Sequence, residues 1–344
     1  MRVPSALLDD LNEPQRQAVT HSGSPLLVVA GAGSGKTRVL TRRIAYLLAE
    51  RNVAPSEVLA ITFTNKAANE MKERVAHIVG PMARTMWVST FHSACVRILR
   101  NEAKRLNLKS SFTIYDTADS VRMLTLVSKD LGIDPKSYSP KYLLGQISNL
   151  KNELIDYEDA MNKAVTAQEQ TVAQAYGEYQ RRLMLASAVD FDDLIGHTVA
   201  LLQSFPDVAA QYRRKFRQVL VDEYQDTNHA QYILIRELVG TDQDGMPPAE
   251  LCVVGDADQS IYAFRGANIR NIVEFERDYP TAKTVVLEQN YRSTQNILTS
   301  ANSVIEKNSG RPVKRLWTAE GSGEKIVIYT ASDEHHEADF IVNN

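Results

Sequence analysis

The chain has 344 residues, of which 44% are hydrophobic and 24% are charged, and its formal net charge is -3. These values exclude a collagen, a small disulfide scaffold and a largely disordered chain, and the length fits roughly two domains. No apolar run approaches the roughly 20 residues that span a bilayer, and residues 1–10 lack the apolar core of a signal peptide. We therefore expect a soluble, cytoplasmic protein.

The positions of the cysteines and the local charge further limit the class of protein and the kinds of site that the sequence can form. Cys95 and Cys252 lie far apart and form no C-x-x-C pattern, so we expect two buried, reduced thiols and no zinc site. The negative net charge does not suit a small architectural DNA-binding protein. Between Phe63 and Lys109, however, nine Lys/Arg outnumber three Asp/Glu, a local balance of +6. This stretch fits either a solvated helix surface or a nucleic-acid-binding one.

Six short apolar runs rich in Val and Ile alternate with segments of helical periodicity. Runs of this length fit strands buried on both faces, and their alternation with helices favours an α/β fold with a mostly parallel sheet. The predicted strands are residues 26–30, 58–64, 86–90, 219–221, 251–254 and 284–287.

The segment AGAGSGKT at residues 30–37 follows the first predicted strand and precedes a helical pattern, the context of a phosphate-binding loop. Small residues let backbone N–H groups turn toward a triphosphate, Lys36 reaches the β- and γ-phosphates, and the Thr37 hydroxyl reaches Mg²⁺. Ala30 stands at the first position of G-x-x-x-x-G-K-T, which needs only a small residue. The alternative interpretation is a glycine-rich turn without a ligand.

Residues 113–189 break the strand–helix alternation, because they are polar, favour helix and lack β-branched runs. Val172, Tyr176, Tyr179 and Leu183 recur there at helical spacing. The stretch is too long for a loop, so we predict a helical subdomain inserted between two strands of the sheet.

The predicted strand at 219–221 ends in two carboxylates, Asp222 and Glu223. In P-loop proteins a partner strand delivers an acid to Mg²⁺, and Asp222 is the candidate. Glu223 is then placed to orient and deprotonate the water that attacks the γ-phosphate. Two acids at the end of a strand are usually only solvated. The interpretation of Asp222 and Glu223 as functional residues therefore depends on the phosphate-binding loop.

The last 20 or so residues have the pattern of a strand followed by a helix. After a Gly-Ser-Gly turn, residues 325–330 have a strand-like pattern, and Ser332, Asp333 and Glu334 are typical of a helix start. The chain stops about three turns into that helix, so we expect the beginning of a longer protein. A short natural appendage is the alternative.

Four further motifs resemble, in order and spacing, those of the UvrD/PcrA/Rep family of superfamily 1 DNA helicases. They are DEYQ at 222–225, GDADQSIY at 255–262, FRGA at 264–267 and QNYRS at 289–293. FTNKAA at 63–68 and TFHS at 90–93 resemble the DNA-contacting motifs of the family. The resemblance extends from Leu11 to about the last residue.

The resemblance implies the residues of an ATP site. Gln15 would read adenine, Gln259 would sense the γ-phosphate and Tyr291 would stack on the base. Arg265 and Arg292 match arginines that stabilise γ-phosphate charge, a role that the spread of charge in the transition state supports. The implied catalytic residues are Lys36, Asp222, Glu223, Gln259, Arg265 and Arg292. The implied nucleotide contacts are Gln15, Ala32, Gly33, Ser34, Gly35, Lys36, Thr37, Arg38 and Tyr291, and Thr37 and Asp222 would hold Mg²⁺.

A single-stranded DNA groove is implied in the same way. Its implied lining is Phe63, Asn65, Thr90, His92, Tyr262 and Phe264, with Phe191 as a weaker candidate. Aromatic faces suit this task because they stack on any base, and the basic stretch would track phosphates. Phe264 stands where relatives commonly have Trp, which leaves a smaller stacking face. Phe191 fits equally well as a buried anchor for the inserted helices.

The resemblance therefore implies a bacterial, nucleoid-associated, ATP- and Mg²⁺-dependent 3′–5′ DNA helicase or translocase of DNA repair or replication. Its substrates would be single-stranded DNA and single-strand/duplex junctions, with repair or replication proteins as possible partners, no membrane, and a monomeric or dimeric state. Residues 1–112 and 190–288 would form a first RecA-like domain, 113–189 the helical insertion and 289–344 the start of a second RecA-like domain. Two alternatives remain: a nucleotide- and DNA-binding module with little turnover, or the motor of a helicase-nuclease.

Overall fold

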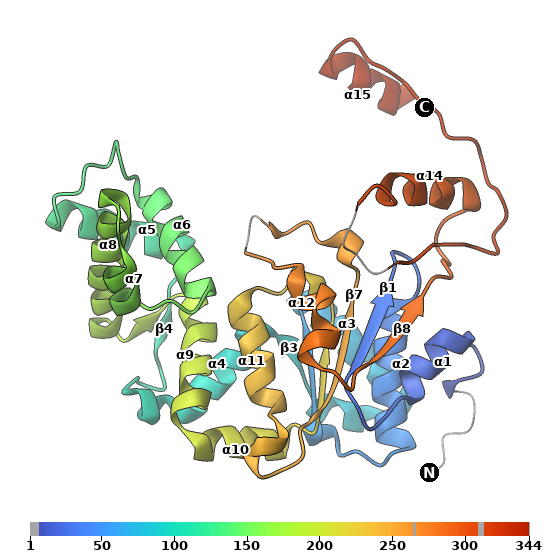
Figure 1. Cartoon of the computed structure of the whole chain (residues 1–344), viewed down its shortest axis with the longest axis horizontal. Coiled ribbons are helices and arrows are strands. Elements are labelled where there is room, and N and C mark those ends of the chain that lie inside the picture. Colours follow the sequence, from blue (N-terminus) through green and yellow to red (C-terminus); the bar gives the residue numbers. More distant parts are fainter. Residues whose placement is uncertain (1–6, 264–265, 309–312, 344) are drawn as a thin grey trace.

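A six-stranded parallel sheet forms the centre of the computed structural model, which describes residues 7–263, 266–308 and 313–343 (Figure 1). The strand order is β3-β2-β6-β7-β1-β8, and every neighbouring pair is parallel. The strands are β1 (Leu26–Ala30), β2 (Val58–Thr62), β3 (Trp87–Thr90), β6 (Gln218–Val221), β7 (Glu250–Gly255) and β8 (Lys283–Leu287). The carboxyl end of β1 therefore lies between those of β7 and β8.

Helices cover both faces of this sheet (Figure 1). Several begin at side-chain caps: Asn12, Thr64 and Thr90 each accept a hydrogen bond from a first-turn N–H group. The α-helices are α1 (Glu13–Thr20), α2 (Lys36–Ala49), α3 (Asn65–Val79), α4 (Phe91–Glu102), α5 (Thr117–Asp130), α6 (Pro140–Asn152), α7 (Tyr157–Lys163), α8 (Ala167–Leu185), α9 (Phe191–Ser204), α10 (Pro206–Lys215), α11 (His229–Val239), α12 (Arg270–Val273), α13 (Phe275–Asp278), α14 (Gln295–Ile305) and α15 (Glu334–Asn343).

Successive residues of each strand enter opposite cores, because side chains alternate across a sheet. In β1, Leu27 and Val29 pack in a core with residues of α4, α9, α10 and α11. Leu26, Val28 and Ala30 pack in a second core with residues of α1, α2 and α3. Both faces are therefore apolar, which explains the continuous hydrophobic runs of the sequence.

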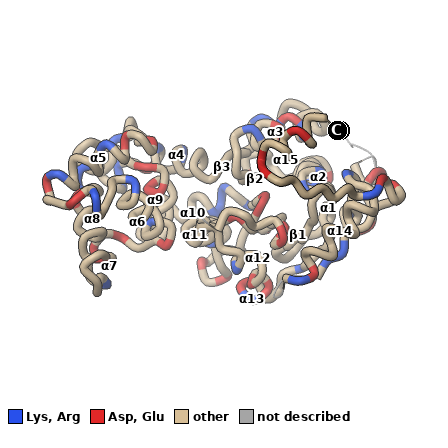
Figure 2. Tube along the Cα trace, turned by 90° about the horizontal axis from the view of Figure 1, so that it is seen from above, with Lys and Arg blue, Asp and Glu red and all other residues tan. Residues whose placement is uncertain are grey.

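Between α4 and α9 the chain leaves the sheet and forms a third core. The four residues predicted from helical spacing are buried in it: Val172, Tyr176, Tyr179 and Leu183. Two short strands, β4 (Thr113–Ile114) and β5 (Ala188–Val189), pair in parallel where the chain leaves and returns. Seen from above, these helices lie at one end of the molecule and the sheet at the other (Figure 2).

The predicted α/β class with a parallel sheet and helices on both faces is confirmed (Figure 1). All six sheet strands are present, with small shifts at their ends; β2, for example, ends at Thr62. Cys95 and Cys252 are buried and unpaired, as expected. No helix in the described ranges is long and apolar enough to cross a membrane.

One predicted strand is wrong. Residues 325–330 form no strand, and Ile326, Val327 and Ile328 are 52%, 75% and 89% exposed. A strand needs a neighbour to take up its backbone hydrogen bonds, and none of the described segments pairs with this one. The helix after it is present as α15, where Asp333 Oδ1 accepts from His336 N at 2.9 Å.

Candidate nucleotide and DNA site

The loop after β1 has the conformation of a phosphate cradle. Gly33 and Gly35 have φ values of +72° and +89°, which glycine adopts without a steric penalty. The buried Ser34 Oγ donates to Gly31 O at 2.7 Å and closes the turn. α2 begins at Lys36, so its unpaired N-terminal N–H groups and the positive end of its dipole lie at the loop.

Lys36 and Glu223 meet although 187 residues separate them in sequence. Lys36 Nζ donates to Glu223 Oε2 at 2.9 Å. Only β7 separates β1 from β6 in the sheet, so the residues that follow these parallel strands reach the same edge. Glu223 has a φ of +49°, in the left-handed region that non-glycine residues rarely adopt. Strain of this kind persists where surrounding contacts hold a residue in place, which is common at functional sites.

The carboxylates beside this pair fit a divalent cation. Burial and the Glu223 charge raise the pKa of Asp222 to about 6, and the same causes raise the pKa of Asp226 to about 6. Asp226 Oδ1 is buried with no hydrogen-bond partner among the described residues. Thr37, the second residue of α2, is half-buried. The described chain has no group of three or more His, Cys, Asp and Glu side chains that could hold a metal.

Gln15 lies against the phosphate loop, and its amide is already engaged. Gln15 Nε2 donates to Ser34 O at 3.0 Å, and its Oε1 accepts from Asn12 N at 3.2 Å in a capping box of α1. Arg38 donates to Asp10 O at 2.8 Å and pairs with the Asp10 carboxylate. Both predicted nucleotide contacts therefore lie at the loop, held by protein partners.

The QNYRS segment contacts the phosphate loop directly. Tyr291 N donates to Gly33 O at 2.9 Å, and Asn290 Nδ2 donates to Ala32 O at 2.6 Å. The Tyr291 ring is 45% exposed, which leaves area for stacking. Arg292 is exposed, and its backbone N–H donates to Asn290 Oδ1 at 2.8 Å.

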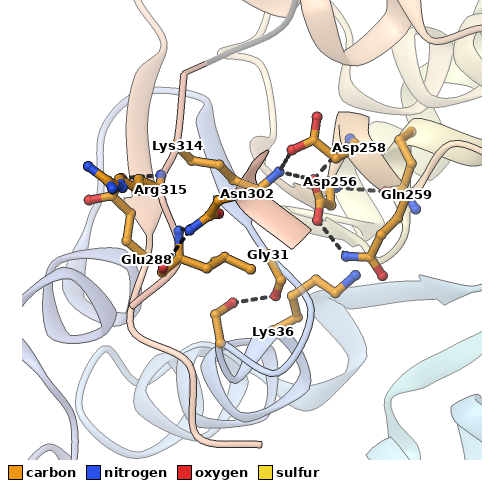
Figure 3. Close-up of polar contacts among 12 residues, drawn as sticks. Gly31, Lys36, Asp256, Asp258, Gln259, Glu288, Asn302, Lys314 and Arg315 are labelled. Atoms are coloured by element: carbon orange, nitrogen blue, oxygen red, sulfur yellow. Dashed lines mark hydrogen bonds and ion pairs between the residues drawn. The ribbon is translucent and has the colours of Figure 1, made fainter. Parts of the chain in front are cut away.

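Hydrogen bonds connect Glu223 with Gln259. Gln225 Nε2 donates to Glu223 Oε2 at 3.0 Å, and Gln225 Oε1 accepts from Asp256 N at 2.9 Å. The Asp256 carboxylate in turn accepts from Gln259 Nε2, as Figure 3 shows. The predicted phosphate sensor and the predicted base thus belong to one network.

A cavity of about 750 Å³ brings predicted DNA contacts and predicted catalytic residues together. Its lining includes Phe63, Thr90, His92 and Tyr262 together with Glu223 and Gln259. Phe63 and Tyr262 are 36% and 37% exposed, so part of each ring remains accessible. Two further predicted residues, Phe264 and Arg265, lie outside the described residues.

Phe191 and Asn65 are not among the cavity-lining residues, and several of the predicted DNA contacts have partners within the protein. The Phe191 ring meets His92 edge-on, with centroids 5.6 Å apart, and is 48% exposed. The interpretation of Phe191 as a buried anchor is therefore wrong. Thr90 caps α4 by accepting from Ser93 N, and Asn65 Oδ1 accepts from Ser93 Oγ at 3.5 Å. Burial lowers the pKa of His92, which keeps the ring neutral at pH 7.

The cavity lining is acidic rather than basic. Asp192, Glu223 and Asp226 line it, whereas no Lys or Arg of the described chain does. Burial and the charge of Asp190 raise the pKa of Asp192 to about 6. The basic side chains of residues 63–109 thus lie outside the cavity, and contact between them and DNA stays a prediction. Figure 2 shows Lys and Arg interspersed with Asp and Glu.

Sequence reasoning gave no role to several residues that the structure places in the site. Gln225, Asp256 and Asn290 stand inside the quoted motifs, and Asp256 directly follows a buried strand, which was a usable signal. Lys314, which pairs with Asp256, comes from a segment without a motif. No local pattern could have indicated it.

Comparisons with known proteins show the family of the chain. Residues 11–280 match the family model described as the UvrD/REP helicase N-terminal domain, and residues 285–344 match that of the UvrD-like helicase C-terminal domain. The relative named ATP-dependent DNA helicase UvrD1 of Mycobacterium tuberculosis is 66% identical, over 97% of this chain and 44% of its own length. The UvrD1 of Mycobacterium leprae is 63% identical, over 98% of this chain and 44% of its own length.

A more distant relative, named ATP-dependent DNA helicase PcrA of Staphylococcus aureus, is 53% identical over 98% of this chain and 46% of its own length. The chain thus spans less than half the length of these relatives. The first family model alone matches well over half of the chain. The chain belongs to the UvrD/REP helicase family.

Proposed function

We propose that this chain binds ATP and single-stranded DNA as the motor part of a bacterial DNA helicase or translocase. One observation carries the proposal: a single cavity is lined both by aromatic rings suited to stacking on bases and by Glu223 and Gln259 of the phosphate site. Coupling of hydrolysis to movement on DNA requires that each site responds to the other, and a shared lining supports this. The printed names of the relatives, ATP-dependent DNA helicases, support the same class.

The roles of the phosphate-site residues follow from their positions. The loop at 30–37 and the α2 N-terminus bind the phosphates, and Lys36 exchanges its Glu223 partner for the β- and γ-phosphates. Glu223 then orients the attacking water and takes up its proton. Thr37 and Asp222 would hold Mg²⁺, which when bound neutralises phosphate charge.

Finer parts of the proposal come from the family resemblance. They are 3′–5′ movement, action at single-strand/duplex junctions in repair or replication, and a location in the bacterial cytoplasm at the nucleoid. The proposed domains are 1–112 with 190–288, the insertion at 113–189, and a second RecA-like domain that begins at 289. The separate hydrophobic core within residues 124–188 supports the proposed insertion.

ATP hydrolysis by the chain, with and without oligo-dT, tests the proposal. Lys36→Ala serves as the blank, and Lys129→Ala, an exposed lysine of α5, is the matched control. Turnover that DNA stimulates above the blank supports a motor. Binding of both ligands without turnover would instead indicate a binding module, and failure to bind nucleotide or DNA would refute the proposal.

A further inference from the structure

A lysine from residues 285–344, which match the C-terminal family model, contacts the loop of the proposed phosphate sensor. Lys314 is 7% exposed, and its ammonium pairs with the carboxylates of Asp256 and Asp258 (Figure 3). Asp256 is itself only 2% exposed. The two aspartates lie three residues and one residue before Gln259 in the GDADQ motif, so a cation from residues 285–344 is buried against the loop of the proposed phosphate sensor.

The Asp256 carboxylate is shared among three donors. Its Oδ1 accepts from Lys314 Nζ and, at 3.0 Å, from Asp258 N, while Oδ2 accepts from Gln259 Nε2. Because both oxygens are engaged, the carboxylate cannot rotate without losing a partner. The position of Lys314 therefore constrains the side-chain amide of Gln259.

The same network continues to the phosphate loop. Asp256 N donates to Gln225 Oε1, Gln225 Nε2 donates to Glu223 Oε2, and Lys36 Nζ donates to the same Glu223 oxygen. The three donor–acceptor distances are 2.9, 3.0 and 2.9 Å, so each is an ordinary hydrogen bond. An unbroken path thus joins Lys314 with Lys36.

The backbone that follows Lys314 is anchored. Arg315 N donates to Glu288 Oε1 at 2.7 Å, and Asn302 both donates to Leu316 O at 2.9 Å and accepts from Leu316 N at 3.2 Å. Leu316 packs tightly on the phosphate loop, because a Cβ added at Gly31 would clash with Leu316 Cδ2. One short segment therefore contacts both the phosphate loop and the loop that carries Gln259.

We propose that Lys314 is a positioning residue for ATP hydrolysis, which acts through Asp256 to hold Gln259 at the γ-phosphate and links residues 285–344 to the site. This inference rests on the proposed function, because that function assigns Gln259 its role. Burial of an ammonium with two carboxylates carries a desolvation penalty that pairing only offsets. Such a cluster contributes defined geometry more than stability.

Steady-state kinetics on the full chain with oligo-dT test the role. Lys314→Met keeps the length of the side chain and removes its charge, and Lys314→Arg keeps the charge. We expect Lys314→Met to lower kcat by about tenfold to a hundredfold, because misplacement of a catalytic group has effects of this size. KM for ATP should change by less than about twofold, since phosphate binding does not use Lys314. Lys314→Arg should recover most of the loss, and the exposed Lys307→Met should match the wild type.

A double mutant identifies the route of the effect. In a Gln259→Ala background, Lys314→Met should cause no further loss of kcat, because the two residues act as one unit. A full additional loss would overturn the proposal, as would a wild-type kcat in Lys314→Met alone.

Amide hydrogen exchange gives a readout that does not depend on turnover. The Asp258 amide, bonded to Asp256 Oδ1, should exchange at least about tenfold faster in Lys314→Met than in the wild type or in Lys307→Met. Unchanged exchange at residues 256–260 would overturn the inference even in a chain without ATPase activity. Absence of DNA-stimulated hydrolysis in the wild type would instead indicate a binding module and so count against the motor role in the proposed function, and hydrogen exchange would still decide the role of Lys314. If Lys314→Met does not fold, Lys314→Met with Asp258→Asn also removes one of the two carboxylate charges that pair with Lys314, and the same outcomes apply.

Discussion

Lys36 Nζ lies 2.9 Å from Glu223 Oε2, so the cation proposed to bind phosphate is paired with the carboxylate proposed to activate water. The two side chains are 12% and 37% exposed, and an ion pair that solvent reaches contributes modestly to stability. A triphosphate that competes for Lys36 would therefore displace Glu223 at low cost. In this arrangement phosphates in the loop would release Glu223 from Lys36, while Gln225 Nε2 would still donate to the carboxylate.

The first prediction concerns Lys36. Lys36→Ala should lower ATP turnover by about 100- to 1,000-fold, the usual effect of removing a group that stabilises transition-state charge. Because Lys36 is the first residue of α2 and its side chain belongs to neither hydrophobic core of the sheet, thermal unfolding should stay close to the wild type. Retained turnover would refute its phosphate role, and Lys129→Ala controls for the loss of a positive charge.

A second prediction separates binding from hydrolysis. Glu223→Gln keeps the size of the side chain, but it removes the charge that pairs with Lys36 and it removes the proposed base. Titration with a fluorescent ATP analogue should show near wild-type affinity, while single-turnover hydrolysis should stop. Loss of ATP binding would mean that Glu223 belongs to the metal or phosphate contacts, and the proposed division of roles with Asp222 would be wrong.

The third prediction concerns pH. The pKa of Asp222 is raised from its ordinary 3.8 to about 6 by burial and the neighbouring Glu223 charge. The folded state therefore binds this proton more tightly than the unfolded state, and the contribution of Asp222 to stability falls as pH rises from about 4 to about 6. Asp222→Asn should increase the free energy of unfolding at about pH 8, by on the order of 2 kcal/mol, and change it little at about pH 4.

Urea unfolding at both pH values tests this sign. Asp242→Asn, an exposed control, should leave the pH dependence of stability unchanged. A decrease in stability of Asp222→Asn at the higher pH would contradict the prediction.

The fourth prediction concerns the cavity. Phe63→Ala and Tyr262→Ala should each weaken binding of single-stranded DNA by about 1 to 3 kcal/mol, since each removes one stacking face. The loss should be similar for dT and dA oligomers, because stacking does not read sequence. Fluorescence anisotropy at fixed salt measures it, with the exposed Tyr329→Ala as control. Equal affinities of all three variants and the wild type for DNA would show that DNA does not bind in this cavity.

The fifth prediction concerns the junction between the inserted helices and α9. Lys151 Nζ lies 2.7 Å from both Asp190 Oδ2 and Asp193 Oδ1, and all three residues are buried. Lys151→Met would leave two buried carboxylates without their cation and should lower the free energy of unfolding by about 3 to 5 kcal/mol.

Chemical unfolding measures this change. Lys163→Met, which breaks an exposed i,i+4 pair with Asp159, should cost less than about 1 kcal/mol. Similar losses in both variants would show that the buried cluster does not stabilise the junction.

The local pattern of the sequence was sufficient for the elements and for part of the site. The apolar runs predicted all six sheet strands, because a strand buried on both faces has to be apolar at every position. The loop at 30–37 and the acids at 222 and 223 were placed correctly at strand ends. The prediction of a strand at 325–330 was wrong, because β-propensity in a local sequence does not supply a neighbouring strand with which to pair.

The sequence by itself therefore determined the fold class, the phosphate loop and the residue types around it, since these depend on local chemistry and periodicity. Only the tertiary structure decided that Lys36 bonds Glu223, that the cavity lining is acidic although the nearby stretch is basic, and that Lys314 reaches Asp256. The reason is the strand order: β1 pairs with β7 and β8, which come more than 200 residues later in the chain, and no local pattern encodes such pairings.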